Sequence, residues 1–193
     1  MPPQFRNTKE GMASTRVIPE DNRVYATQQY WEDRYKAEPE PFDWFKEWPE
    51  LKEVLSKYIN HSESVLMAGC GNSKLSEQMY EDGYHSILNI DFSEEMKLSD
   101  ESFDVVIDKG TMDALLTSAW EVDEHLAVNI DKMLSEVTRV LKKSGVYIYI
   151  TFGQPHFRKN LLLKDKYNWD LTTERIGDGF HYYIYVLRKR NNE

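Results

Sequence analysis

Apolar and polar positions along the chain follow two rhythms. Short, nearly continuous apolar runs have the length of buried strands, and they occupy residues 64–70, 86–91, 103–108 and 145–152. Between them, apolar residues recur every three or four positions, which is typical of helices that lay one face on a sheet. The predicted helices occupy residues 25–38, 48–59, 72–84 and 126–141, and another begins at Thr111.

The order of these elements indicates a fold class. Strands that alternate with helices favour a parallel α/β sheet. Two further runs, 169–176 and 180–189, flank a short glycine turn and predict an antiparallel hairpin. At 193 residues the chain is predicted to form one domain, residues 23–193, after a flexible polar segment, residues 1–22.

Helix ends carry local signals. Asn72 or Ser73 is the predicted N-cap of the helix that follows the first strand, and Gly83 is its predicted stop. Gly145 is predicted to close the long helix that includes Leu141.

A glycine turn and an acid form the main chemical motif. AGCGNSKLS, residues 68–76, joins the first strand to a helix, where glycines permit a tight turn and a helix N-terminus offers free N–H groups. Asp91 ends the next strand, twenty residues after Gly71, where a carboxylate is expected to accept hydrogen bonds from ribose hydroxyls. A plain tight turn with a solvated Asp91 is the alternative. The motif serves dinucleotide enzymes and methyltransferases alike.

Three features favour a methyltransferase over a dehydrogenase. The chain has no second domain for a dehydrogenase substrate, it closes with the hairpin, and an aromatic N-terminal segment is available to cover a cofactor. The sequence also resembles the class I S-adenosylmethionine-dependent methyltransferases, in particular the group that methylates lysines of translation elongation factor 1-alpha. The motifs that carry this resemblance are QYWEDRY, PFDWF, VLMAGCGNSKLS, NIDFS, FDVVIDKGTMDALL, MLSEVTRVLKKSGVYI, QPHFR, YNWDL and GDGFHYYIYVL.

The resemblance implies a Rossmann-like sheet with helices on both faces and S-adenosylmethionine as cofactor. Trp31, Tyr35 and Trp44 match residues that close over the cofactor, where aromatic faces exclude water and favour the sulfonium charge. Packing of the N-terminal helix against the core is the alternative role for these rings, above all for Trp44.

The remaining positions of the implied cofactor site lie at strand ends. Gly69 matches the glycine beside the methionine part of the cofactor, Asp91 the ribose acid, and Phe92 its neighbour against the adenine. Lys109 matches a position whose backbone lines the cofactor, with a solvated ammonium as the alternative. No metal site is predicted.

Catalysis requires a neutral lysine amine, whereas a lysine side chain in water has a pKa of about 10.4 and carries a proton at neutral pH. Desolvation or a nearby base must remove that proton. Asp113 and His156 follow strand ends on the expected active face. Their alternative roles, a helix-capping Asp113 and a structural His156 bonded to backbone, are favoured, so no catalytic base is assigned.

The link between the second and third strands is unusually short. Only residues 92–102 separate SILNID from FDVVID, whereas parallel crossovers normally need a dozen or more residues. Eleven residues reach about 36–40 Å, which is enough to cross back over one strand as an extended loop. Members of the family carry a helix, a strand and an acidic loop here, about thirty residues more by resemblance, so we expect the usual outer strand and its helix to be missing.

The missing segment has consequences for the cofactor. The adenine would lose one wall and a hydrogen-bond acceptor, which costs about 1–3 kcal/mol. A shortened chain of this kind resembles an exon-skipped isoform or an incorrectly assembled gene. A non-catalytic binding or scaffold form is therefore an alternative to the enzyme, and a small-molecule methyltransferase or a nucleotide-binding oxidoreductase is another.

Charge and composition limit the partners. The net charge of −9 argues against nucleic acid and suits a basic protein substrate, with elongation factor 1-alpha suspected from the resemblance. A single cysteine, Cys70, suits a reducing compartment. The N-terminus lacks an apolar signal region, and no stretch approaches about eighteen apolar residues. These features predict a cytoplasmic protein that does not span a membrane; they leave its oligomeric state open.

Overall fold

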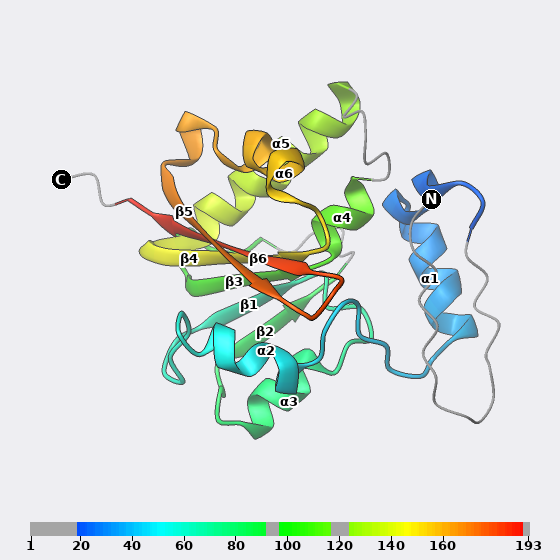
Figure 1. Ribbon diagram of the computed structural model, residues 1–193, viewed down its shortest axis with the longest axis horizontal. Coiled ribbons are helices and arrows are strands. Elements are labelled where there is room, and N and C mark those ends of the chain that lie inside the picture. The colour runs from blue at the N-terminus through cyan, green and yellow to red at the C-terminus, as the bar shows by residue number, and fades with distance from the viewer. Residues whose placement is uncertain (1–18, 92–96, 117–123, 191–193) are drawn as a thin grey trace.

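A computed structural model describes residues 19–91, 97–116 and 124–190 (Figure 1). Most of the segment predicted to be flexible, residues 1–18, lies outside the described chain, as does Phe92. In the described part, six strands form one sheet in the order β2-β1-β3-β4-β6-β5. Their bounds are Val65–Ala68 (β1), Ile87–Ile90 (β2), Phe103–Lys109 (β3), Leu141–Thr151 (β4), Trp169–Ile176 (β5) and Tyr182–Lys189 (β6).

The strand directions confirm the predicted fold class. β2, β1, β3 and β4 run parallel, whereas β6 pairs antiparallel with both β4 and β5. The helices are Gln28–Ala37 (α1), Trp48–Leu55 (α2), Leu75–Glu81 (α3), Thr111–Leu115 (α4), Glu124–Val140 (α5) and Pro155–Leu162 (α6). Two 3-10 turns, Asn22–Ala26 and Asp165–Tyr167, complete the described elements.

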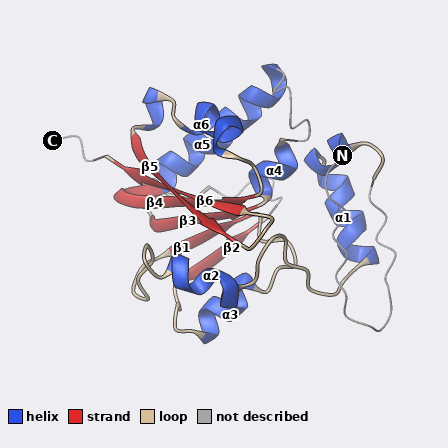
Figure 2. Cartoon of the chain, viewed as in Figure 1, coloured by secondary structure: helices blue, strands red, loops and turns tan. Residues whose placement is uncertain are grey.

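The sheet has a helical layer on each face. α4, α5 and α6 cover one face, and α2 and α3 cover the other (Figure 2). α1 belongs to neither layer and lies beside α4 (Figure 2). Alternate residues of the strands therefore enter different cores, because successive side chains point to opposite faces. In β4, Tyr147 and Tyr149 pack toward α5, while Ile148 and Ile150 pack toward α2 and α3.

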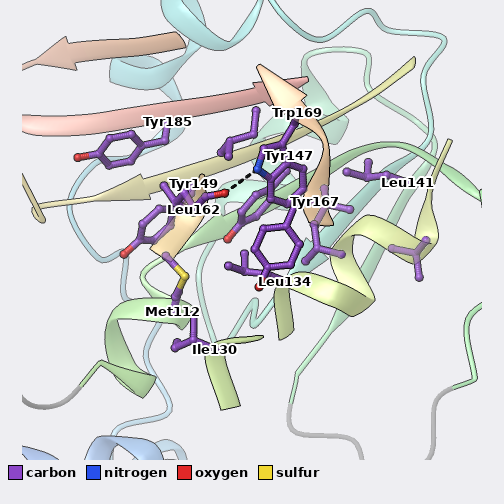
Figure 3. Close-up of a cluster of buried hydrophobic side chains, with 14 of the residues drawn as sticks. Met112, Ile130, Leu134, Leu141, Tyr147, Tyr149, Leu162, Tyr167, Trp169 and Tyr185 are labelled. Atoms are coloured by element: carbon purple, nitrogen blue, oxygen red, sulfur yellow. Dashed lines mark hydrogen bonds between the residues drawn. The ribbon is translucent and has the colours of Figure 1, made fainter. Parts of the chain in front are cut away.

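The core on the α5 side is rich in aromatic rings. Tyr147 stacks on Tyr149 and on Trp169, with ring centroids 6.4 and 6.0 Å apart (Figure 3). The indole N–H of Trp169 donates to the carbonyl of Leu162 at 2.7 Å. These contacts fix α6 and the hairpin against the sheet. None of the described helices is long and apolar enough to cross a membrane.

Several predicted helix boundaries are wrong. α1 begins at Gln28 rather than at residue 25, because residues 22–26 form a 3-10 turn, and α2 ends at Leu55 rather than at residue 59. α3 begins at Leu75, because the Ser73 hydroxyl accepts the Leu75 N–H at 3.1 Å instead of capping a longer helix. α5 ends at Val140, and the buried Leu141 already pairs with Phe103 in the sheet, so Gly145 lies inside β4 and closes no helix. α6 was not predicted from sequence, although Pro155 in its first turn is a helix-start signal.

The short link connects β2 to β3, which are not neighbours in the sheet. β2 is the edge strand, and β1 lies between it and β3. The described part of the link, residues 97–102, contains no helix and no strand. It runs along the end of α5, where the N–H groups of Glu101 and Ser102 donate to the carbonyls of Arg139 and Val140 at 3.0 and 2.8 Å. The described chain therefore forms the expected sheet, which lacks the usual outer strand.

Candidate functional site

A cavity of about 770 Å³, part of it open to solvent, lies at the carboxyl ends of β1 and β3. The glycine turn, α4 and the N-terminal aromatic segment enclose it. Its lining includes six of the seven positions predicted from sequence, Trp31, Tyr35, Trp44, Gly69, Asp91 and Lys109. The seventh, Phe92, lies outside the described residues.

The glycine turn requires its glycines. Gly69 and Gly71 have φ of 71° and 52°, a region that side chains with a Cβ rarely adopt. A Cβ on Gly69 would lie 2.0 Å from the Thr111 hydroxyl, and one on Gly71 would lie 2.4 Å from the Tyr35 hydroxyl. Thr111 reaches this position because its hydroxyl donates to the Ala68 carbonyl at 2.7 Å. The turn is therefore packed between α1 and α4.

The acid predicted at the end of the second strand faces this turn. Asp91 follows β2 directly, and its Oδ2 accepts the N–H of Gly71 at 2.6 Å. A plain solvated side chain, the alternative considered for Asp91, does not describe this arrangement. The carboxylate lies on the cavity wall beside the turn.

The N-terminal aromatic segment also lines the cavity. The Trp31 ring lies 5.7 Å from that of Tyr35 and 6.3 Å from that of Trp44, and the Trp31 indole donates to the Tyr25 carbonyl at 2.7 Å. Trp44 also contacts Phe42 at 5.2 Å, so it packs the segment and lines the cavity at once. Burial, followed by the charge of Asp91, raises the pKa of Tyr35 to about 12, which keeps its hydroxyl protonated.

Lys109 lines the cavity at the predicted position, but its ammonium differs from the solvated group considered as the alternative. The ammonium is not solvated: its Nζ donates to Asp43 Oδ1 at 2.9 Å and to the Trp44 carbonyl at 3.0 Å, and both charged side chains are buried. Asp43 also accepts the Ser73 hydroxyl and the Lys74 N–H. One carboxylate thus joins the PFDWF segment, the end of β3 and the start of α3.

The charges of this pair shape the pKa values of both groups. Burial acts to raise the pKa of Asp43, but Lys109 and the hydrogen bond from Ser73 outweigh it and hold the pKa below its usual value. Burial lowers the pKa of Lys109, and the attraction of Asp43 opposes this. We take both groups as charged, because the short Nζ–Oδ1 contact and the further donors to Asp43 satisfy the pair.

The first N–H groups of α3 are not free, contrary to the sequence prediction. The Lys74 N–H donates to Asp43 at 3.0 Å, and the Leu75 N–H donates to Ser73. Any ligand of the turn therefore meets the glycine backbone and Asp91 rather than the start of that helix.

The two residues weighed as catalytic bases also take other roles. Asp113 caps no helix; its Oδ1 accepts Tyr149, Thr151 and Arg158 at 2.7–2.8 Å in a buried cluster. The capping carboxylate of α4 is Asp108, which accepts the N–H groups of Thr111 and Met112.

His156 is exposed, whereas Asp108 is fully buried. His156 lies in the first turn of α6, and in the described chain its ring makes no backbone hydrogen bond. Burial and the charge of Asp113 raise the pKa of Asp108 to about 7. Neither of the favoured alternative roles, a cap for Asp113 or a backbone bond for His156, is correct.

Sequence reasoning missed Asp43, Asp108 and Thr111. An acid enclosed by aromatic residues, as in PFDWF, was the available signal for Asp43. Asp108 ends a buried strand, and a carboxylate there meets the N–H groups of the next helix. For Thr111 no sequence signal distinguishes a hydroxyl that holds the glycine turn from one that faces water.

These groups fit a nucleoside that carries a cationic sulfur. Asp91 offers a carboxylate for ribose hydroxyls, the glycine turn leaves room for close approach, and Trp31 and Trp44 line the cavity. The Arg34 guanidinium already lies 5.6 and 5.4 Å from the ring centres of Trp31 and Trp44, which shows that these rings accept a cation.

Comparisons with known proteins point in the same direction. A family model described as a methyltransferase domain matches residues 86–184. The chain is 30% identical over 201 residues to EEF1A lysine methyltransferase 4 of Mus musculus, covering 89% of this chain and 79% of the relative. It is 38% identical over 169 residues to the eEF1A lysine and N-terminal methyltransferase of Homo sapiens, covering 74% of this chain and 24% of that protein.

Fold similarity extends to more distant proteins. A SAM-dependent methyltransferase from Methanosarcina mazei superimposes with a TM-score of 0.52 at 14% identity, covering 77% of this chain and 99% of that structure. The mouse alignment also contains positions that this chain lacks. Since 89% of 193 residues is about 172, about 29 of its 201 positions have no residue of this chain.

Proposed function

Because this chain belongs to the class I S-adenosylmethionine-dependent methyltransferases, we propose that it methylates a lysine of translation elongation factor 1-alpha in the cytoplasm. The observation that carries the proposal is the similarity to the mouse relative, which is named for this substrate and of which the chain spans 79%. The net charge of −9 supports a basic protein acceptor.

The cofactor is S-adenosylmethionine, which supplies a methyl group already activated by its positive sulfur. The residues of this chain bind and orient it. Asp91 accepts hydrogen bonds from the ribose hydroxyls, and the glycine turn lets the backbone approach the ligand. Trp31, Tyr35 and Trp44 exclude water from the reacting atoms and favour the cation.

The acceptor amine must arrive neutral and in line with the methyl group. Apolar and aromatic walls lower the pKa of a lysine amine by removing water from its charged form. The cavity provides such walls through Trp31, Phe42 and Trp44. We assign no catalytic base, since Asp113 and Asp108 are held by internal hydrogen bonds.

The proposal is tested by incubating the full chain with S-adenosylmethionine and unmethylated elongation factor 1-alpha. Mass spectrometry of the acceptor should show methyl groups on one lysine, and Asp91→Ala should strongly reduce the product at a cofactor concentration that just saturates the native chain. A chain that binds the cofactor but leaves this acceptor unmodified, while modifying another protein or a small molecule, would contradict the proposed substrate.

A further inference from the structure

Two exposed phenylalanines lie near the cofactor cavity without a role in it. Phe152 follows the end of β4, and Phe180 lies in the turn between β5 and β6. Each side chain is 42% exposed. Each ring therefore keeps apolar surface in contact with water, and a partner that covered both rings would remove that unfavourable contact.

The two rings belong to one continuous surface. Phe45 lies 5.9 Å from Phe152 and 5.5 Å from Tyr182, and Tyr182 lies 5.2 Å from Phe180, all between ring centroids. We call these four residues, Phe45, Phe152, Phe180 and Tyr182, the aromatic ridge. It combines the PFDWF segment, the end of β4 and the hairpin, three regions far apart in sequence.

The ridge begins at the mouth of the cavity. Its inner member, Phe45, packs beside Trp44 at 6.3 Å, and a Cβ on Gly110 would lie 3.3 Å from the Phe45 ring. Trp44 and Gly110 both line the cavity. Phe45 also has a φ of 68°, which is strained for a bulky residue, and strain of this kind concentrates at functional sites.

We propose that the aromatic ridge is the docking surface for the protein acceptor, contacting apolar side chains that flank the target lysine. This inference rests on the proposed function. The ridge continues the wall of the cavity outward, so a segment lying on it would bring its lysine to the mouth. Aromatic residues are also the side chains that most often dominate binding at protein interfaces.

Charge identifies which partner fits the ridge. Lys46, whose Nζ lies 5.8 Å from the Tyr182 ring centre, is paired with Glu50. A second copy of this chain would bring its own net charge of −9, and an anionic membrane would also be repelled. A basic protein is the occupant whose charge complements this chain.

The test compares Phe152→Ser/Phe180→Ser with Tyr80→Ser. Tyr80 is 57% exposed and lies on α3, beside His85 and toward the β2 edge of the sheet, whereas the ridge lies at β4 and β6; this makes it a matched loss of exposed aromatic surface. Steady-state methylation of elongation factor 1-alpha should show the KM of the double variant raised about tenfold or more, as for interface hot spots. Calorimetry should show its affinity for S-adenosylhomocysteine, and that of the control, unchanged.

Each other outcome overturns a distinct statement. If the native chain methylates elongation factor 1-alpha and the double variant does so with an unchanged KM, the ridge is not the docking surface. The proposed function would then still hold. Cofactor binding with neither methylation nor binding of elongation factor 1-alpha overturns both for this acceptor. If the native chain forms a dimer or binds anionic vesicles, and the double variant loses that property while its KM is unchanged, the ridge binds a different occupant.

Discussion

The two sides of the cofactor cavity are built very differently. On the side of the glycine turn, the buried Asp43–Lys109 pair, Thr111 and the aromatic segment hold three parts of the chain together. On the side of Asp91, β2 is a four-residue edge strand, and the chain returns to β3 through the short link. Of the described residues between β2 and β3, only Asp91 lines the cavity.

We infer from this difference that the cavity does not depend on the segment that the family pattern places after β2. The contacts of the glycine turn come from the N-terminal segment, from α4, from Asp91 and from the Ile90 carbonyl at the end of β2, which accepts the N–H groups of Gly69 and Cys70 at 2.8 and 3.1 Å. Removing an outer strand and its helix therefore leaves the turn intact and exposes the edge, where the Leu88 side chain is 38% exposed. We expect substitutions on the first side to have large effects and changes near the adenine to have small ones.

The largest effect is expected from Asp43→Ala. This change leaves the Lys109 ammonium buried without its partner, a loss that typically costs about 3–5 kcal/mol. For a chain of this size that corresponds to roughly 6–20 °C in melting temperature. Differential scanning calorimetry measures it.

The control for Asp43→Ala removes both charges. Asp43→Ala combined with Lys109→Met should recover much of the lost stability, because no charge is left buried. Equal melting temperatures for the native chain and Asp43→Ala would show that the first side of the cavity is not held by this pair.

The pH dependence of stability should show the next effect, through Asp108 beneath α4. Its pKa is raised to about 7 in the folded chain, so the folded state holds a proton that the unfolded state has released. Stability from this group therefore falls as the pH rises from about 4 to about 7 and is constant above that.

The measurement is a series of melting curves between about pH 5 and about pH 7.5, where we expect a decline of roughly 5–11 °C from this group. Asp108→Asn carries no titrating carboxyl and should show a flatter profile. Parallel profiles for the native chain and Asp108→Asn would place the Asp108 pKa outside this range.

A smaller effect, confined to binding, is expected from Asp91→Ala. Loss of a charged acceptor for the ribose should weaken S-adenosylhomocysteine binding by about 1.5–3 kcal/mol, or roughly 10- to 150-fold. Isothermal titration calorimetry gives the value, with Asp178→Ala, an exposed acid in the hairpin turn, as the matched control. Equal weakening in both variants would point to net charge rather than to a ribose contact.

The smallest effect is expected at the adenine amine. S-adenosylhomocysteine with a methyl group on N6 should bind within about threefold of the parent ligand, less than about 1 kcal/mol. A full adenine wall with a hydrogen-bond acceptor would reject this analogue more strongly. Discrimination by two orders of magnitude in competition titrations would therefore contradict an open adenine side.

Sequence was informative where structure is decided locally. Apolar runs identified the strands of the sheet, and the glycines at Gly69 and Gly71 identified the turn, because these depend on neighbouring residues. The length of the link indicated the missing outer strand, since chain reach is a simple geometric limit. Gly69, Asp91 and Lys109 meet in one cavity for the same reason, since they lie at strand ends, whereas Trp31, Tyr35 and Trp44 were predicted from the family resemblance.

Sequence was uninformative where a residue distant in the chain determines the local structure. The start of α3 moved to Leu75 because Ser73 and the Lys74 N–H bond to Asp43, about thirty residues earlier in the chain. The ammonium of Lys109 is buried because it pairs with the carboxylate of Asp43. Asp113 looked like a helix cap, but Arg158 and two hydroxyl groups recruit it into another cluster.

The most direct test is a calorimetric titration of the full native chain with S-adenosylhomocysteine, accompanied by a melting curve of the same sample. We predict one saturable site for each chain with a micromolar dissociation constant, because the side of the cavity that holds the glycine turn is complete. A chain that melts cooperatively yet gives no binding heat, and whose melting temperature the ligand does not raise, would show that the shortened link has removed the cofactor site.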